Sequence, residues 1–179
     1  MTDQHFAEIL RRPYAASLKM LRNVIEKCPD DLWDAQLDEA PPWQQALHTL
    51  FYTRLYLLSD VRGEEATEHA QVVLRLIGET QTKADSVGKT MWSLTKKDYR
   101  PPRVPTKQEL LECLARCESS LDAALNDIEN GAGGNPSPAE WIKGDRAHLM
   151  VYNLRHIQHH VGRLNGMLGR RGVQLEWQG

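Results

Sequence analysis

Four long segments of this chain repeat apolar residues at the spacing of one helix face. They cover residues 5–28, 43–60, 106–129 and 145–169, and stretches rich in proline or glycine separate them. No segment shows the alternation of apolar and polar residues that is typical of a half-buried strand. A chain of 179 residues with this pattern predicts a single all-α domain over residues 1–179, built as a four-helix bundle.

Local signals predict several helix ends within this pattern. Pro42 suits the first position of the second helix, because proline needs no backbone N–H donor there. Thr106 and Glu109 have the spacing of a capping box, which predicts the start of the third helix. Pro13 falls inside the first helix, so a kink or a helix start is expected there. Residues 60–105 are the least regular part and predict one or two short helices and a proline-rich loop.

Charge and hydropathy exclude several classes of protein. A formal net charge of -2 does not favour a polyanion-binding surface, so no nucleic acid partner is expected. No apolar run is long enough for a membrane span, and the N-terminus lacks the apolar core of a signal peptide. These features predict a cytoplasmic protein without a membrane partner. Three cysteines, an odd number, argue against a disulfide framework, and Cys113 and Cys117 are interpreted as small buried residues.

Histidines are concentrated in the last long segment. Four of the chain's seven histidines lie between residues 148 and 160. On a helical wheel centred on Leu149, His156 and His160 lie at about −20° and +20°, so they share one face, a turn apart. A pair of histidines at this spacing can direct both rings to one metal ion. The alternative is that both rings face the core and are bonded to neighbouring groups.

His48 adds a third imidazole from the second helix. It lies beside the apolar stripe of that helix, near its inward edge, and has no evident local partner. Three histidines on two facing helices would leave coordination positions open on a divalent ion, which catalysis needs for water or substrate. Imidazole suits zinc, nickel, copper and iron, so the identity of the ion stays open. His5, His69 and His148 are predicted on outer faces or helix ends and receive no role.

Two blocks of sequence resemble the DinB-like superfamily of metal-binding helical bundles. "PPWQQALHTLFYTRLYL" (41–57) resembles the second helix of that family, with its early histidine. "LRHIQHHVGRLNGML" (154–168) resembles its fourth helix, with the pattern H-x-x-H-H. "RVPTKQELLECL" (103–114) and the tail tryptophan, Trp177, agree more weakly with the family.

This resemblance implies a four-helix bundle with an up-down-down-up chain path. It also implies a divalent ion, often nickel or zinc, bound by His48, His156 and His160. Characterised relatives include metal-dependent transferases and isomerases that use a low-molecular-weight thiol, and many members have no established activity. Although the name comes from a DNA-damage-inducible gene, the fold does not imply DNA binding.

Polar side chains near the three histidines are candidates for contacts with a substrate. Tyr52, one turn after His48, and Asn153 are predicted to bind substrate; the alternative for Tyr52 is a core aromatic with an exposed hydroxyl. Arg163 is expected at the rim of the bundle, paired with a carboxylate. No side chain stands out as a general base, and His159, the one candidate, is not favoured.

Three functions are consistent with these patterns. The first is an enzyme whose metal ion activates a thiol or water toward a small-molecule substrate, with Trp92, Tyr99 and Arg100 at the pocket rim. The second is a metal-binding stress-response protein without catalytic activity. The third is a helical interaction module whose histidines are structural. A homodimer is a further expectation, because the apolar residues of segment 60–80 could cover either the core or a partner.

Overall fold

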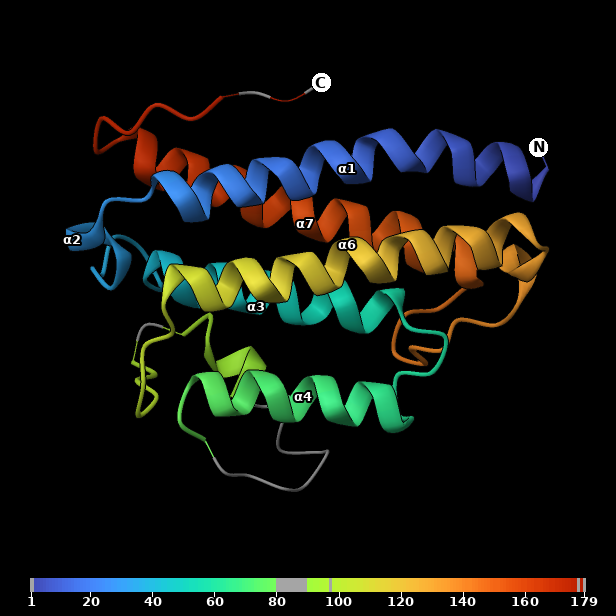
Figure 1. Cartoon of the computed structure of the whole chain (residues 1–179), viewed down its shortest axis with the longest axis horizontal. Helices are drawn as coiled ribbons and strands as arrows, with labels where there is room; N and C mark the ends of the chain where they lie inside the picture. The colour runs from blue at the N-terminus through green and yellow to red at the C-terminus, as the bar shows by residue number, and fades with distance from the viewer. Residues whose placement is uncertain (1, 80–89, 97, 177, 179) are drawn as a thin grey trace.

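The computed structural model describes residues 2–79, 90–96, 98–176 and 178. Its helices are α1 (Asp3–Lys27), α2 (Asp30–Trp33), α3 (Pro42–Leu57), α4 (Glu64–Leu76), α6 (Lys107–Glu129), the 3-10 helix η1 (Ala132–Gly134) and α7 (Arg146–Gly169) (Figure 1). No strand forms in this described part of the chain, where β-type pairing is limited to an isolated bridge between Pro136 and Asp145. The prediction of an all-α fold is confirmed, whereas the tail tryptophan, Trp177, lies outside the described residues.

The four long helices α1, α3, α6 and α7 pack against one another (Figure 1). Arg11 of α1 pairs with Glu129, the last residue of α6. Farther along α1, Arg22 pairs with Glu118, so these two helices are antiparallel. In Figure 1, α3 runs in the same direction as α6, and α7 runs in the same direction as α1. The early residues of α3 therefore lie beside the later residues of α7.

Local sequence signals account for several helix ends. Thr106 is the N-cap of α6, and the side chains of Thr106 and Glu109 form the predicted capping box. Pro42 is the first residue of α3, as predicted. Pro13 lies inside α1, which begins directly after its N-cap residue Thr2, so the alternative of a helix start at Pro13 is wrong.

Helix α3 is buried on nearly all sides. Its buried side chains include the polar residues Gln44, Gln45, Thr49 and Thr53. This burial arises because α4 packs against α3 in addition to α6 and α7. Main-chain carbonyls accept hydrogen bonds from some of these side chains: Gln44 Nε2 donates to Tyr99 at 3.0 Å, and Thr49 Oγ1 donates to Gln45 at 2.7 Å. The predicted apolar stripe is thus only part of the buried surface of this helix.

The packing of α4 on α3 corrects the prediction for His69. This residue was expected on an outer face, but only 2% of its surface is exposed. Its Nε2 lies 3.0 Å from the carbonyl oxygen of Phe51, and its ring stacks on the Phe51 ring. The same contact between helices buries Val73, Leu74 and Ile77. These residues of the apolar segment therefore cover the core of their own chain.

A buried arginine closes the C-terminal end of α3. Arg146, the first residue of α7, is only 4% exposed. Its guanidinium donates to the carbonyl oxygens of Tyr56 at 2.9 Å and Leu58 at 2.8 Å, and also to that of Leu57. Carbonyls in the last turn of a helix lack N–H partners within the helix. Arg146 supplies those donors from a neighbouring helix and so joins the start of α7 to the end of α3.

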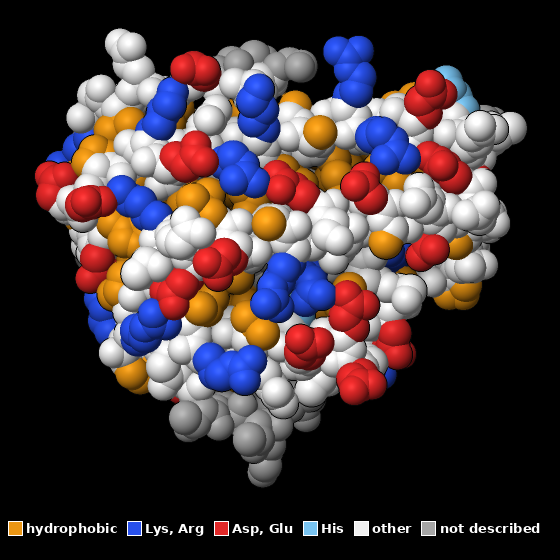
Figure 2. Space-filling view, viewed as in Figure 1, with side chains coloured by type: hydrophobic (Ala, Val, Ile, Leu, Met, Phe, Trp, Pro, Cys, Tyr) orange, Lys and Arg blue, Asp and Glu red, His pale blue; other side chains and the backbone are white. Residues whose placement is uncertain are grey.

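The surface charges and the state of the cysteines agree with what the composition predicted. On the face drawn in Figure 2, basic and acidic side chains are interspersed, and neither sign dominates a large area. Cys28, Cys113 and Cys117 are free and buried, as expected for the last two. His5 and His148 are exposed, also as predicted. Among the described helices, none combines the length and apolar character needed to cross a bilayer.

Candidate metal centre

Three histidines from two antiparallel helices converge on one another. His48 belongs to α3, and His156 and His160 belong to α7. Each ring offers one nitrogen, and these three nitrogens all lie within 4.8 Å of one another. The Nε2 atoms of His48 and His156 are 3.4 Å apart. The structure therefore brings together the three histidines that were predicted to share an ion.

The spacing of these nitrogens suits a divalent cation. Zinc–imidazole bonds of about 2.0–2.1 Å in a tetrahedral arrangement place two ligand nitrogens roughly 3.3 Å apart. The separation between the Nε2 atoms of His48 and His156 is close to this value. The three ligand nitrogens as a group are separated by up to 4.8 Å, which is wider than this spacing, so binding of one ion would require a side chain to move inward. Three imidazoles would leave at least one coordination position for water or substrate.

A backbone carbonyl orients His48. Nδ1 of His48 lies 3.0 Å from the carbonyl oxygen of Met91, which is in the helical turn 90–93. A carbonyl oxygen only accepts hydrogen bonds, so Nδ1 carries the proton and Nε2 has a free lone pair. That lone pair is on the side of His156 Nε2. This is the arrangement by which many metal-binding histidines are held in one tautomer and one orientation.

The other two histidines have buried nitrogens without protein partners. Nδ1 of His156 and Nδ1 of His160 are both buried and accept or donate no hydrogen bond within the described part of the chain. Leaving a buried polar atom unsatisfied costs about 1–3 kcal/mol. Nε2, not Nδ1, is the His156 atom that faces His48, so the case for a bound cation rests on the convergence of the three rings and not on these Nδ1 atoms.

Burial keeps the three imidazoles neutral. Removal from water, together with the neighbouring histidine rings, lowers the pKa of His156 to about 3 and that of His160 to about 2. Burial also lowers the pKa of His48, although its hydrogen bond to Met91 opposes the shift. Metal ligands must be deprotonated, so the cluster is in its metal-binding form at neutral pH.

The three histidines line a pocket of about 670 Å³, which we call the histidine pocket. Its volume lies within the usual range for small-molecule sites, which is about 300–1,000 Å³. The wall is largely aromatic, and polar or charged groups are interspersed with the rings. The lining residues are Glu39, His48, Tyr52, Tyr56, Trp92, Thr95, Lys96, Trp141, Tyr152, His156, His159, His160 and Arg163.

Of the two residues predicted to contact substrate, one lines the histidine pocket and the other does not. Tyr52 lines the histidine pocket, and its ring centroid is 4.8 Å from that of His48. Asn153 is fully buried between α3 and α7, where its Nδ2 donates to the carbonyl of Thr53 at 3.0 Å. Asn153 does not belong to the pocket lining. Its amide nitrogen therefore joins the two helices, and a contact between Asn153 and a substrate stays a prediction.

Of the residues expected at the pocket rim, some line the histidine pocket and others do not. Arg163 lies at the pocket and pairs with Asp38 and Glu39, as predicted. Trp92 lines the pocket and is 58% exposed. Tyr99 and Arg100 are not in the lining; the hydroxyl of Tyr99 donates to Glu79, and Arg100 donates to Gln36.

Sequence reasoning missed several aromatic residues of the pocket. Tyr56 and Tyr152 lie at helical spacing from His48 and His156, so a wheel of either helix could have revealed them. Trp141 comes from the connection between η1 and α7, and no spacing rule links it to the histidines.

Comparison with models of known protein families identifies the family of this chain. The model of the DinB superfamily matches residues 14–164. The chain belongs to the DinB superfamily. The matched range includes His48, His156 and His160, so the candidate metal centre lies wholly within the part shared with the superfamily. No curated protein and no solved structure matches the chain.

Proposed function

We propose that this DinB superfamily protein is a divalent-metal-dependent enzyme that acts on a small molecule. The observation that carries the proposal is the convergence of three neutral imidazoles on the wall of an accessible pocket. His48, His156 and His160 would hold the ion, with nickel or zinc as the proposed metals. When bound, such an ion supplies Lewis-acid chemistry and lowers the pKa of a coordinated thiol or water.

The chain's own residues would hold and shield the reactants. The hydrogen bond from His48 to Met91 keeps the Nε2 lone pair available. Tyr52 and Tyr56 line the pocket, and burial raises the pKa of both phenols, so both stay protonated near neutral pH. Neither tyrosine therefore serves as a general base. The aromatic wall reduces the access of water and so strengthens polar contacts with a bound substrate.

The position of the cysteines supports an external thiol as co-substrate. Cys28, Cys113 and Cys117 are buried, and none of these three described residues lines the histidine pocket. Burial raises the pKa of Cys28 to about 11 and that of Cys113 to about 11, which disfavours the reactive thiolate. If the reaction uses sulfur chemistry, a low-molecular-weight thiol has to enter the pocket. Transfer of that thiol to an electrophile, or a thiol-assisted isomerisation, is the reaction class proposed.

Metal analysis with a matched pair of variants tests the ligand set. Purified protein is loaded with nickel or zinc, dialysed and measured by elemental analysis. His160→Ala should lose nearly all bound metal, whereas His159→Ala, which removes the adjacent exposed imidazole, should retain it. Full metal content in His160→Ala would refute the proposed ligands.

Turnover separates the enzyme from the alternative of a non-catalytic metal-binding stress-response protein. Loaded and metal-free protein are assayed with several low-molecular-weight thiols and small electrophiles. Turnover that needs both metal and thiol supports the proposal. A protein that binds metal on these histidines but accelerates no reaction would instead fit the stress-response alternative.

A further inference from the structure

The charged residues described in the lining of the histidine pocket, apart from the histidines, lie toward one end of it. Glu39 lies before α3 and pairs with Arg163, which is in the second half of α7. Lys96 lies shortly after Met91, whose carbonyl contacts His48 in the first half of α3. We call the end lined by Glu39, Lys96 and Arg163 the charged end.

The opposite end of the pocket is lined by rings. Tyr56 lies in the last turn of α3, Tyr152 lies in the first half of α7, and Trp141 comes from the connection before α7. The ring centroids of Tyr56 and Tyr152 are 5.6 Å apart. A hydrogen bond joins the side chains of Trp141 and Tyr56, and the indole N–H is its donor. We call the end lined by these three residues the aromatic end.

The candidate metal centre lies between the two ends. The ring centroid of Tyr56 is 6.2 Å from that of His156. Tyr52 lies beside both groups, because its ring centroid is 5.6 Å from that of Tyr56 and 5.8 Å from that of His156. A molecule held at the aromatic end would therefore bring a short substituent to the three histidines, and the charged end would be left for a second, polar reactant.

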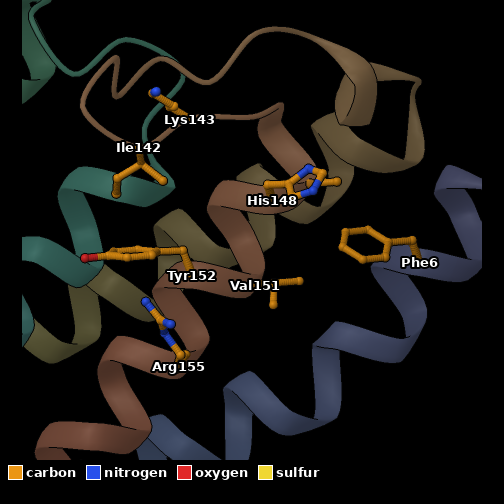
Figure 3. A pocket seen from close by; sticks show the side chains of 8 residues that line it. Phe6, Ile142, Lys143, His148, Val151, Tyr152 and Arg155 are labelled. Carbon is orange, nitrogen blue, oxygen red and sulfur yellow. The ribbon is translucent and has the colours of Figure 1, made fainter.

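The ring of Tyr152 is fixed by contacts on the outer side of α7. In Figure 3 this ring lies between Ile142 and the guanidinium of Arg155, which is 5.0 Å from the ring centroid. Both faces of the ring are thereby covered, so Tyr152 lines the histidine pocket with its edge. Tyr56 is only 4% exposed, and its ring is inclined at 80° to that of Tyr152. Rings that are already held in place lower the entropic cost of binding a ligand.

An exposed indole gives the aromatic end its free apolar surface. Trp141 is 55% exposed, so a ligand that covers it removes apolar area from water. The edge of an aromatic ring is electropositive and its face is electronegative, so the edge of Tyr152 attracts the face of another aromatic ring. A saturated ring of similar size has no such face. The aromatic end therefore favours a planar aromatic ring over an aliphatic group.

We infer that the aromatic end binds a planar aromatic ring, and that the substrate of the proposed enzyme is a small aromatic compound whose reacting atom lies on a short substituent of that ring. The assignment of the ring to the substrate rests on the proposed function, whereas binding of the ring requires no metal ion. The pocket volume of about 670 Å³ is sufficient for such a compound together with a second reactant.

Titration with benzyl alcohol tests the inference. The alcohol is added to metal-free and to metal-loaded protein, and binding is followed by ligand-observed NMR. Saturable binding is expected in both forms. Cyclohexylmethanol has the same hydroxyl group and the same number of carbon atoms but a saturated ring, so it should bind about fivefold more weakly.

Two exposed tryptophans of the same pocket locate the bound ring. Trp141→Ala should weaken the binding of benzyl alcohol about fivefold, and Trp141→Phe, which keeps an aromatic ring, should retain most of the affinity. Trp92→Ala is the matched variant, because Trp92 is 58% exposed but lies beside Lys96 of the charged end. It should leave the affinity for benzyl alcohol unchanged. Circular dichroism melting confirms that each variant is folded.

Three results would overturn the inference: no saturable binding within the solubility of benzyl alcohol, equal affinities for the two alcohols, or equal weakening by Trp141→Ala and Trp92→Ala. A failure of the proposed function gives a different result. Wild-type protein that holds no metal would refute the enzyme, while its metal-free form would still bind benzyl alcohol. Turnover that requires metal, without any binding of benzyl alcohol, would refute only the aromatic end as a ring site.

Discussion

Acid titration of the metal-free protein tests how deeply the histidine cluster is buried. Burial lowers the pKa of His156 to about 3 and that of His160 to about 2, whereas histidine in an unfolded chain titrates near about 6.5. As the pH falls below that value, the unfolded state takes up protons that the folded state does not. The free energy of unfolding therefore decreases from near neutral pH until the pH reaches the folded-state pKa values.

The expected size of this decrease follows from proton uptake by the unfolded chain. Between about pH 7.5 and about pH 5, one histidine that stays neutral in the folded state lowers the free energy of unfolding by about 2 kcal/mol. His156 and His160 together account for about 4 kcal/mol. The amount depends little on the folded-state pKa values as long as both remain well below 5. Such a loss is large against a typical total of about 5–15 kcal/mol.

Urea denaturation at the two pH values measures the effect. The protein is treated with chelator, and unfolding is followed by far-UV circular dichroism. The matched variant is His156→Gln/His160→Gln, which replaces both imidazoles by neutral amides. Wild type should lose about 4 kcal/mol more than this variant on acidification, because His48 and His69 titrate in both proteins. Equal losses in the two proteins would show that the cluster is accessible to protons and would refute the reasoning.

Three further substitutions test separate features. Arg146→Met removes the donor to three carbonyls at the end of α3, so we expect the free energy of unfolding, measured by urea denaturation, to fall by about 3 kcal/mol. An unchanged midpoint would mean that the free-energy cost of burying the guanidinium offsets its hydrogen bonds. Thr106→Ala breaks the capping box of α6 and should lower the melting temperature by about 2–4 °C, whereas Ser119→Ala, at an exposed position inside the same helix, should not lower it. Tyr52→Phe should reduce turnover of the loaded enzyme and leave the metal content of the protein unchanged. A loss of metal on elemental analysis would contradict the assignment of Tyr52 to the pocket lining and not to the metal ligands.

Periodic sequence patterns predicted the parts of the molecule in which one helix face is buried and the other exposed. α1, α6 and α7 have this character, and their observed ends lie within a few residues of the predicted ones. The pairing of His156 and His160 could be predicted for the same reason, because a helical wheel places them one turn apart on one face. His48 required more, since only a bundle in which α3 and α7 face each other brings it to the pair.

Contacts between distant segments account for what the sequence did not reveal. Asn153 was expected at the pocket because it lies on the histidine side of the wheel, but in the packed bundle it reaches the Thr53 carbonyl of α3. His69 was placed outside because nothing in the local sequence of α4 indicates that α3 lies beneath it. Trp141 enters the pocket from an irregular connection, whose path depends on tertiary packing and not on periodicity.

The bond between His48 and Met91 has an evolutionary consequence. Its acceptor is a main-chain oxygen, which every amino acid possesses, so the contact does not depend on which side chain occupies position 91. The segment around residues 90–93 can therefore diverge among descendants of a common ancestor while the imidazole stays correctly oriented, provided that the path of the backbone persists. Insertions or deletions in this segment would be the damaging changes, because they move the oxygen itself.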